Sequence, residues 1–168
     1  MQNHFDLFGL TPKFSIEGEA LERSYREIQS KVHPDRFAHA GDAERRASLQ
    51  WTTRVNEAYR TLKDPVQRAR HILELHGVDV AFETNTAMPP EFLMQQMELR
   101  ESLEGAKTPA ALDEMRKRLQ QEKDGLQTQI GEAIDSKKDY TAAAGLVRKL
   151  QFLDRLDEEI DSAYEEIE

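Results

Sequence analysis

The sequence predicts an all-α protein, with an antiparallel helical hairpin and short helices in its N-terminal part and a three-helix bundle in its C-terminal part. Three observations carry this prediction. Apolar residues recur every three or four positions along most of the chain, as they do on one face of a helix. Proline, glycine and capping residues lie between these periodic segments. No stretch of the 168 residues has the alternating pattern that is typical of a strand.

The N-terminal part is expected to contain four helical segments. Residues 4–10 form a short apolar turn that ends near Gly9 and Pro12, and Ser15 is a candidate cap for the next helix. That helix runs to about residue 32. A third helix begins near Asp42 and pairs with the second. Asp64 and Pro65 end it and begin a fourth, which stops near residues 76–77. The predicted buried face of the third helix consists of Ala47, Trp51, Val55, Ala58, Tyr59 and Leu62.

The short segment His33-Pro34-Asp35 lies between the second and third helices. Pro34 fixes its own φ and disfavours a helical conformation at His33, so the second helix should end at Val32. Two interpretations are open: an ordinary turn, or a loop that presents polar side chains to a partner. His33 and Asp35 could also act as an acid–base pair, but no nucleophile or pocket is implied beside them, so we do not expect an enzyme.

Basic residues lie on the second helix close to this loop. Arg23 and Arg26 are on the side opposite its apolar face. Such residues are usually a solvated face, but beside an exposed polar loop they could form a docking surface for an acidic partner.

The C-terminal part begins after a predicted linker at residues 77–90. The helix from Pro90 carries Phe92, Leu99 and Leu103 on one side, whereas Leu93, Met94 and Met97 lie on another. Methionine recurs at adaptable binding surfaces. The second stripe, which is bordered by Glu98, Arg100 and Glu101, is therefore either a protein-binding patch or a face buried in the bundle.

Two longer helices complete the predicted bundle. Thr108 should cap the first of them, with Pro109 at its first position, and Gly125 and Gly131 should weaken it locally. Asp139 or Thr141 should cap the last helix. Phe152 lies at the edge of its apolar seam, where it is either core rim or part of a binding face.

Composition and charge exclude several kinds of site. The absence of cysteine excludes disulfides and thiolate ligands, and the five histidines lack metal-like spacing, so we expect neither a metal nor another cofactor. There is no signal-peptide pattern in residues 1–10 and no run of ~20 apolar residues, so we expect no membrane segment. Residues 1–75 hold 12 basic and 11 acidic side chains, whereas residues 76–168 hold 11 and 21. This imbalance suggests two units with different partners and argues against nucleic-acid binding.

The first 75 residues resemble a J domain. The matching positions are Tyr25, Ile28 and Val32, residues 33–37, and residues 55–65. The resemblance extends over nearly the whole chain to HscB, the J-type co-chaperone of iron–sulfur cluster assembly, through residues 5–10, 68–69, 75–77, 92–94, 98–101, 147–150 and 152–154. It implies a J domain at residues 1–76, a linker at 77–90 and a bundle that binds the iron–sulfur scaffold at 91–168.

The resemblance also implies partners and site residues. The J domain is expected to bind the DnaK-type chaperone HscA and to stimulate its ATPase through His33, Pro34, Asp35, Arg23, Arg26, Lys31 and Arg36. The bundle is expected to bind the scaffold protein IscU through Leu93, Met94, Met97, Glu98, Arg100, Glu101 and Phe152. The chain lacks the cysteine-containing extension of some eukaryotic relatives, so it resembles the bacterial, cytoplasmic form. The alternatives are a general J-domain co-chaperone for other clients and a helical adaptor without a chaperone partner.

Two departures from the family pattern are conservative. Arg36 stands where many J domains have lysine, which keeps the positive charge. Met97 stands where a leucine is expected, which roughly conserves the side-chain volume.

Overall fold

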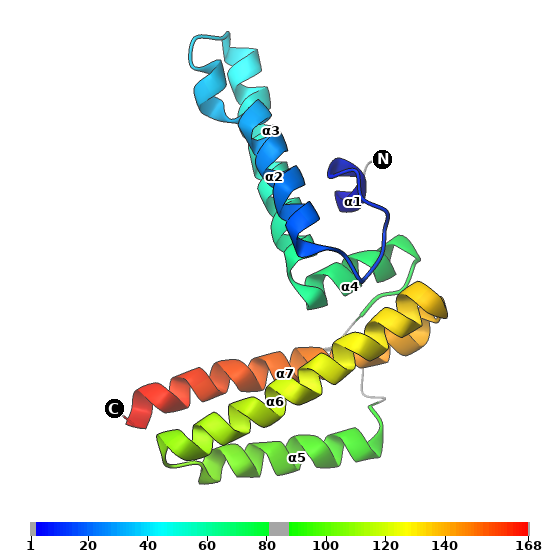
Figure 1. Cartoon of the computed structure of the whole chain (residues 1–168), viewed down its shortest axis with the longest axis vertical. Coiled ribbons are helices and arrows are strands. Elements are labelled where there is room, and N and C mark those ends of the chain that lie inside the picture. The colour runs from blue at the N-terminus through cyan, green and yellow to red at the C-terminus, as the bar shows by residue number, and fades with distance from the viewer. Residues whose placement is uncertain (1–2, 81–87, 168) are drawn as a thin grey trace. The chain divides into compact units, whose positions relative to one another are not determined.

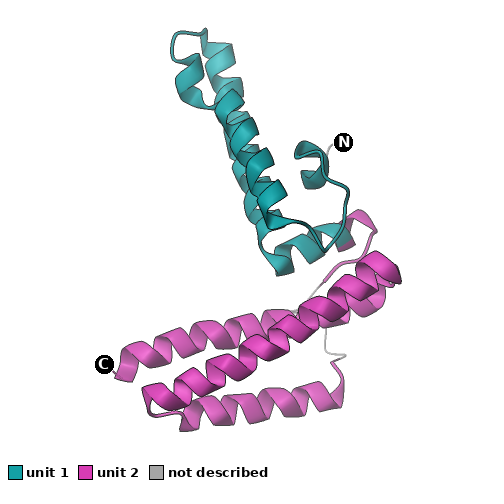
Figure 2. Cartoon of the chain, in the orientation of Figure 1, with its two compact units in different colours: residues 1–72 teal, residues 73–168 magenta. Residues whose placement is uncertain are grey.

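The computed structural model describes residues 3–80 and 88–167, so the middle of the predicted linker lies outside the described residues. The described part is all-α, as predicted, and contains no strand. It divides into two compact units, residues 1–72 and 73–168 (Figure 2). The functional division at residues 76 and 91 stays a prediction.

The first unit is built on an antiparallel pair of helices (Figure 1). The elements are α1 (His4–Leu7), α2 (Gly18–Val32), the 3₁₀ turn η1 (Pro34–Phe37), α3 (Asp42–Lys63) and α4 (Pro65–Leu75), whose last three residues belong to the second unit. Helix α2 ends at Val32, as Pro34 predicts. Asp64 caps α4, because its Oδ2 accepts from the Gln67 N–H at 3.0 Å. Helix α2 begins after Glu17, two residues beyond the predicted cap Ser15, and the Glu17 side chain makes no capping hydrogen bond.

The core of the first unit lies where α1, α3 and α4 meet. Its buried residues include Phe5, Val55, Leu62 and Ile72. Figure 1 shows α1 beside the half of the hairpin that is farther from η1. Within the described part of the first unit, no third helix covers the half nearest η1, which explains one wrong prediction. Trp51 is 41% exposed, and Ala47 is also exposed, although both belong to the helical pattern of the buried face.

The second unit is a three-helix bundle. It consists of α5 (Pro90–Gly105), α6 (Pro109–Gly131), the π-helical turn η2 (Glu132–Ser136) and α7 (Tyr140–Ile167) (Figure 1). Helix α6 continues through Gly125, and its N-terminus is capped as predicted, with the Ala111 N–H donating to Thr108 Oγ1 at 3.2 Å. Asp139 caps α7 through the Ala142 N–H at 3.1 Å.

Apolar packing holds the bundle together. Its core cluster comprises Phe92, Leu99, Leu112, Met115, Leu119, Phe152, Leu153, Leu156 and Ile160. Burial of an apolar side chain of this size contributes roughly 1.5–3 kcal/mol. No helix in residues 3–80 or 88–167 is long and apolar enough to cross a membrane.

Ion pairs join α6 to α7 beside this core. Lys123 Nζ lies 2.9 Å from Asp154 Oδ1 and 3.4 Å from Asp157 Oδ2. Burial opposes the charge on Lys123, but hydrogen bonds and charge from the two aspartates outweigh it and raise its pKa. Arg116 pairs with Asp157 and Asp161 one turn farther along α7. These contacts fix the register of α6 on α7.

Candidate partner-binding surfaces

The His-Pro-Asp loop forms a compact, open turn directly after α2. His33 has an extended backbone, and Pro34 starts η1. The His33 ring is held by the turn, because its Nδ1 accepts from the Asp35 N–H at 3.2 Å. That bond selects the tautomer whose proton is on Nε2. The Asp35 side chain is 93% exposed, so its carboxylate is available to a donor on a partner.

Two hydroxyl groups of α3 hold the end of α2 in place. The last helical carbonyl, that of Val32, accepts from Ser48 Oγ at 2.6 Å and from Thr52 Oγ1 at 3.2 Å. Ser48 is only 3% exposed. Carbonyl groups at a helix C-terminus have no partner within the helix. The two hydroxyl groups supply this missing partner at Val32, immediately before His33, and they therefore position the loop. We call Ser48 and Thr52 the hydroxyl clamp.

Sequence reasoning missed the hydroxyl clamp. Ser48 and Thr52 lie four residues apart on α3, so they share a face. They could have been recognised as polar residues within the buried face of the hairpin. The sequence does not reveal that they stand opposite Val32, because that depends on how α2 and α3 are aligned.

The predicted basic residues of α2 are exposed, but they alternate with acidic ones. Arg26 Nη2 lies 2.6 Å from Glu22 Oε1, and Lys31 Nζ lies 3.8 Å from Glu27 Oε1. Exposed pairs of this spacing contribute only about 0.3–0.5 kcal/mol each. A partner with acidic groups could therefore recruit these cations at little cost. Arg23 is exposed on the same helix.

Arg36 lies at the loop itself. Its Nη1 donates to the Ser30 carbonyl at 3.3 Å, so the side chain folds back over the last turn of α2. Like the hydroxyl clamp, this contact satisfies a carbonyl near the C-terminus of the helix.

A stack of two tyrosines joins α2 to α3 farther from the loop. The rings of Tyr25 and Tyr59 lie 4.0 Å apart, centroid to centroid. The Tyr25 hydroxyl donates to Asn56 Oδ1 at 2.7 Å and accepts from Gln29 Nε2 at 3.2 Å. These contacts set how α2 lies on α3 and hence the direction in which its basic residues point.

The second stripe of α5 is exposed. Met94 and Met97 are 62% and 65% exposed, and Leu93 is also exposed, whereas Phe92 and Leu99 are buried on the other side. Of the two interpretations left open by the sequence, the structure rules out a helix buried on both sides. An exposed apolar group of this kind is unusual on a solvated helix and marks a candidate interaction site. The name α5 patch is used below for Leu93, Met94, Met97, Glu98, Arg100 and Glu101.

Phe152 belongs to the core beneath this patch. It is 4% exposed, and its ring meets that of Phe92 edge to face at 5.7 Å between centroids. The Arg100 guanidinium lies 5.4 Å from the centroid of Phe152 and donates to Glu159 of α7 at 3.0 and 3.1 Å. Phe152 therefore offers almost no surface to a partner, and its contact with the patch runs through Arg100.

The two sets of predicted residues lie on different units. His33, Pro34, Asp35, Arg23, Arg26, Lys31 and Arg36 are in the first unit, and the α5 patch with Phe152 is in the second. The side chains of both sets are open to solvent or engaged in packing. Among residues 3–80 and 88–167, no three His, Asp or Glu side chains are grouped as metal ligands.

Comparison with known proteins assigns a family to each part of the chain. Residues 3–71 match the model of the DnaJ domain, and residues 88–161 match that of the HSCB C-terminal oligomerisation domain. The co-chaperone protein HscB homolog of Azoarcus sp. (strain BH72) is 48% identical over 170 residues, which cover 99% of this chain and 96% of that protein. The HscB homolog of Burkholderia multivorans is 49% identical over 169 residues, with the same coverage.

Solved structures give the same result. The chain is similar to chaperone HscB from Vibrio cholerae, with a TM-score of 0.87, 34% identity, and coverage of 99% of this chain and 100% of that one. It is also similar to the human co-chaperone protein HscB, with a TM-score of 0.92, 27% identity, and coverage of 96% and 81%.

Proposed function

The chain belongs to the HscB family of J-domain co-chaperones of iron–sulfur cluster assembly, and we propose that it stimulates the ATPase of the DnaK-type chaperone HscA and delivers the scaffold protein IscU to it. The observation that carries the proposal is the presence of two exposed surfaces of different chemistry on two units of one chain. One is a polar loop beside cations, and the other is an apolar patch with a charged border. Two such surfaces suit a protein that brings two partners together.

The chaperone partner is assigned to the first unit. Asp35 and His33 present polar groups on a loop that the hydroxyl clamp holds in place. Arg23, Arg26 and Lys31 supply positive charge on the adjoining helix, which favours an acidic face and speeds association. The protein need not touch ATP. It can favour the hydrolysing state of the chaperone only by contacting that state better than the other.

The scaffold partner is assigned to the α5 patch. Leu93, Met94 and Met97 provide exposed apolar area, and methionine side chains adapt to the shape of a partner. Glu98, Arg100 and Glu101 form a polar border, which is typical of a protein interface. The buried Phe92 and Phe152 keep α5 rigid beneath this surface.

The proposed role requires no resident cofactor. The iron–sulfur cluster is cargo of the scaffold, and this chain acts on proteins alone. We place the exchange in the bacterial cytoplasm, in line with its bacterial relatives, and assign no nucleic-acid or membrane partner.

Two variants test the two assignments separately. Asp35→Asn keeps the size of the side chain but removes its negative charge, and it should abolish stimulation of HscA in a single-turnover ATPase assay while scaffold binding is unchanged. Met94→Ala with Met97→Ala should weaken binding to IscU by roughly 1–3 kcal/mol, the scale of interface anchors. The same variant should still stimulate the HscA ATPase when IscU is absent, because that stimulation is assigned to the first unit. Full stimulation by the Asp35 variant, or unchanged IscU affinity of the methionine variant in calorimetry, would refute the corresponding assignment.

A further inference from the structure

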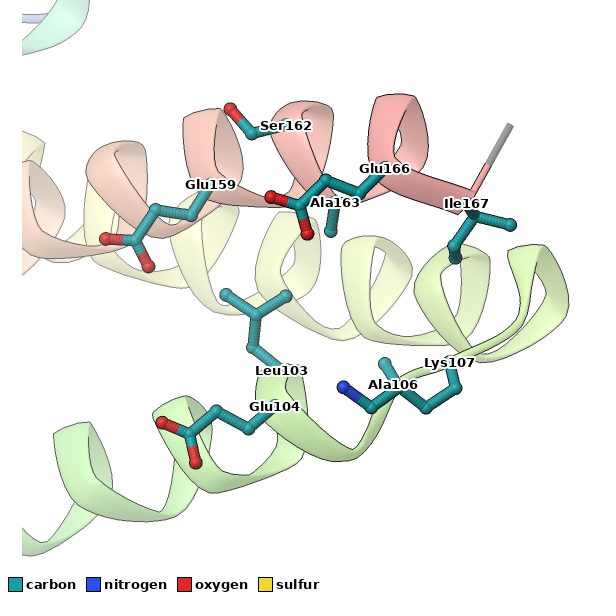
Figure 3. Close-up of a pocket in the computed structure, with 9 residues that line it drawn as sticks. All are labelled: Leu103, Glu104, Ala106, Lys107, Glu159, Ser162, Ala163, Glu166 and Ile167. Carbon is teal, nitrogen blue, oxygen red and sulfur yellow. The ribbon is translucent and has the colours of Figure 1, made fainter.

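A groove of about 570 Å³ lies between the end of α5 and the last turns of α7 (Figure 3). Apolar groups of Leu103, Ala163 and Ile167 form part of its lining. Figure 3 shows Leu103 pointing from α5 toward α7. Ile167 is one of the large apolar residues that remain exposed. The groove can therefore accept an aliphatic chain.

The rim of this groove is acidic. Glu104 comes from α5, whereas Glu159 and Glu166 come from α7, and Lys107 is the one basic residue in the lining. Glu159 is engaged by Arg100 at 3.0 Å. Within the described part of the chain, no ion pair engages Glu104 or Glu166. Two carboxylates thus remain beside an apolar lining.

Lysine and arginine side chains match this combination. Each has an aliphatic stem that packs on apolar surface and a charged head that stays near water or a carboxylate. Lys107 can offset only one of the two carboxylates, so an acidic or purely apolar segment would leave the groove with an uncompensated negative charge. The chemistry of the groove therefore favours a positively charged segment of a protein.

The groove is continuous with the α5 patch. Arg100, a member of the patch, donates to Glu159 on the rim of the groove. Glu101, also in the patch, is three residues from Glu104, so the two lie on neighbouring turns of one face. A protein that covers the patch would meet the groove at its edge.

We infer that the groove receives a lysine or arginine side chain of the same scaffold protein that binds the α5 patch. This inference rests on the proposed function. The patch supplies apolar contact, and the groove adds selection for a positively charged neighbouring segment. Scaffold binding should therefore depend on salt through Glu104 and Glu166.

The test is the affinity of full-length protein for IscU, measured by calorimetry at two salt concentrations. Glu104→Gln with Glu166→Gln should weaken binding about threefold to tenfold at about 50 mM salt, and the difference should nearly vanish at about 500 mM. The matched control is Glu114→Gln with Glu165→Gln, which removes two exposed charges from the same unit outside the groove. The control should bind like the unmodified protein.

The other outcomes overturn the inference in distinguishable ways. Unchanged affinity of the groove variant, with the unmodified protein still binding IscU, rejects the groove and leaves the proposed function intact. Equal losses in the groove and control variants show a general effect of acidity. No binding by the unmodified protein refutes the scaffold assignment itself. If the groove variant changes self-association in sedimentation and leaves the affinity for IscU unchanged, the groove binds a second copy of the chain instead.

Discussion

Removal of the hydroxyl clamp tests whether the position of the His-Pro-Asp loop matters as well as its chemistry. The change is Ser48→Ala with Thr52→Val, which removes both donors to the Val32 carbonyl and leaves the loop residues themselves untouched. Thr53→Val is the matched control, because Thr53 donates at 3.0 Å to Leu49 of its own helix and not to α2.

The expected loss of stability follows from the contacts. A hydrogen bond contributes about 1 kcal/mol net, and a buried acceptor left without a partner costs about 1–3 kcal/mol. Ser48 is nearly fully buried, so water can replace its hydroxyl only if α2 separates from α3. We expect Ser48→Ala alone to lower the unfolding free energy by about 1 kcal/mol, because Thr52 remains, and the double variant by about 1–3 kcal/mol.

The functional effect should appear in how HscA stimulation depends on the concentration of the co-chaperone. If the held loop is the binding-competent form, the apparent affinity falls in proportion to the competent fraction. A cost of about 1.4 kcal/mol lowers the ratio of held to released loop about tenfold, so it raises the co-chaperone concentration at half-maximal HscA stimulation by up to about tenfold, with the maximal rate nearly kept. The assay is single-turnover ATP hydrolysis over a range of co-chaperone concentrations. A double variant that is less stable but has an unchanged half-maximal concentration would refute the positioning role.

Two further predictions concern stability. Gly125→Ala should raise the unfolding free energy of the second unit by about 0.5–1 kcal/mol, because an added Cβ has no atom within 4 Å and alanine favours a helix; circular dichroism during urea unfolding measures this, and a destabilised variant would contradict it. In the first unit, burial and the charge of His4 lower the pKa of His71, whose Nε2 accepts from the His4 N–H at 3.2 Å. The unfolded chain then binds a proton more readily, so the unfolding free energy should fall as pH drops from about 7.5 to about 5. Fluorescence of the sole tryptophan, Trp51, reports on the unfolding of this unit. His71→Gln should reduce the change of the unfolding free energy with pH. An equal change with pH in the variant would assign the pH dependence to other groups.

Helix boundaries were the most predictable part of the fold. Pro34 marked the end of α2, Asp64 and Pro65 separated α3 from α4, and Thr108 capped α6. These signals are local, since a proline ring or a capping oxygen acts within one turn of its own position. The second apolar stripe of α5 was also visible in advance, because a second apolar face on one helix shows directly in the residue spacing, but the spacing left open whether that face is exposed or buried.

Features that depend on contacts between elements could not be predicted from local sequence signals. The pattern of α3 placed Trp51 on the buried face, but periodicity does not say where a third layer ends. Phe152 lay at the edge of a seam, where a few degrees of rotation decide between core and surface. The hydroxyl clamp requires the alignment of α2 on α3, and the groove requires the packing of α5 on α7.

The coupling of the two surfaces is the central claim, and the ATP turnover of HscA tests it most directly. Turnover should be measured for HscA alone, with this protein, with IscU, and with both. The proposed function predicts that the rate with both exceeds the product of the two separate stimulations. Stimulation without this synergy would keep the J domain but assign the bundle to another client. No stimulation in any mixture would contradict the chaperone assignment and leave a helical adaptor.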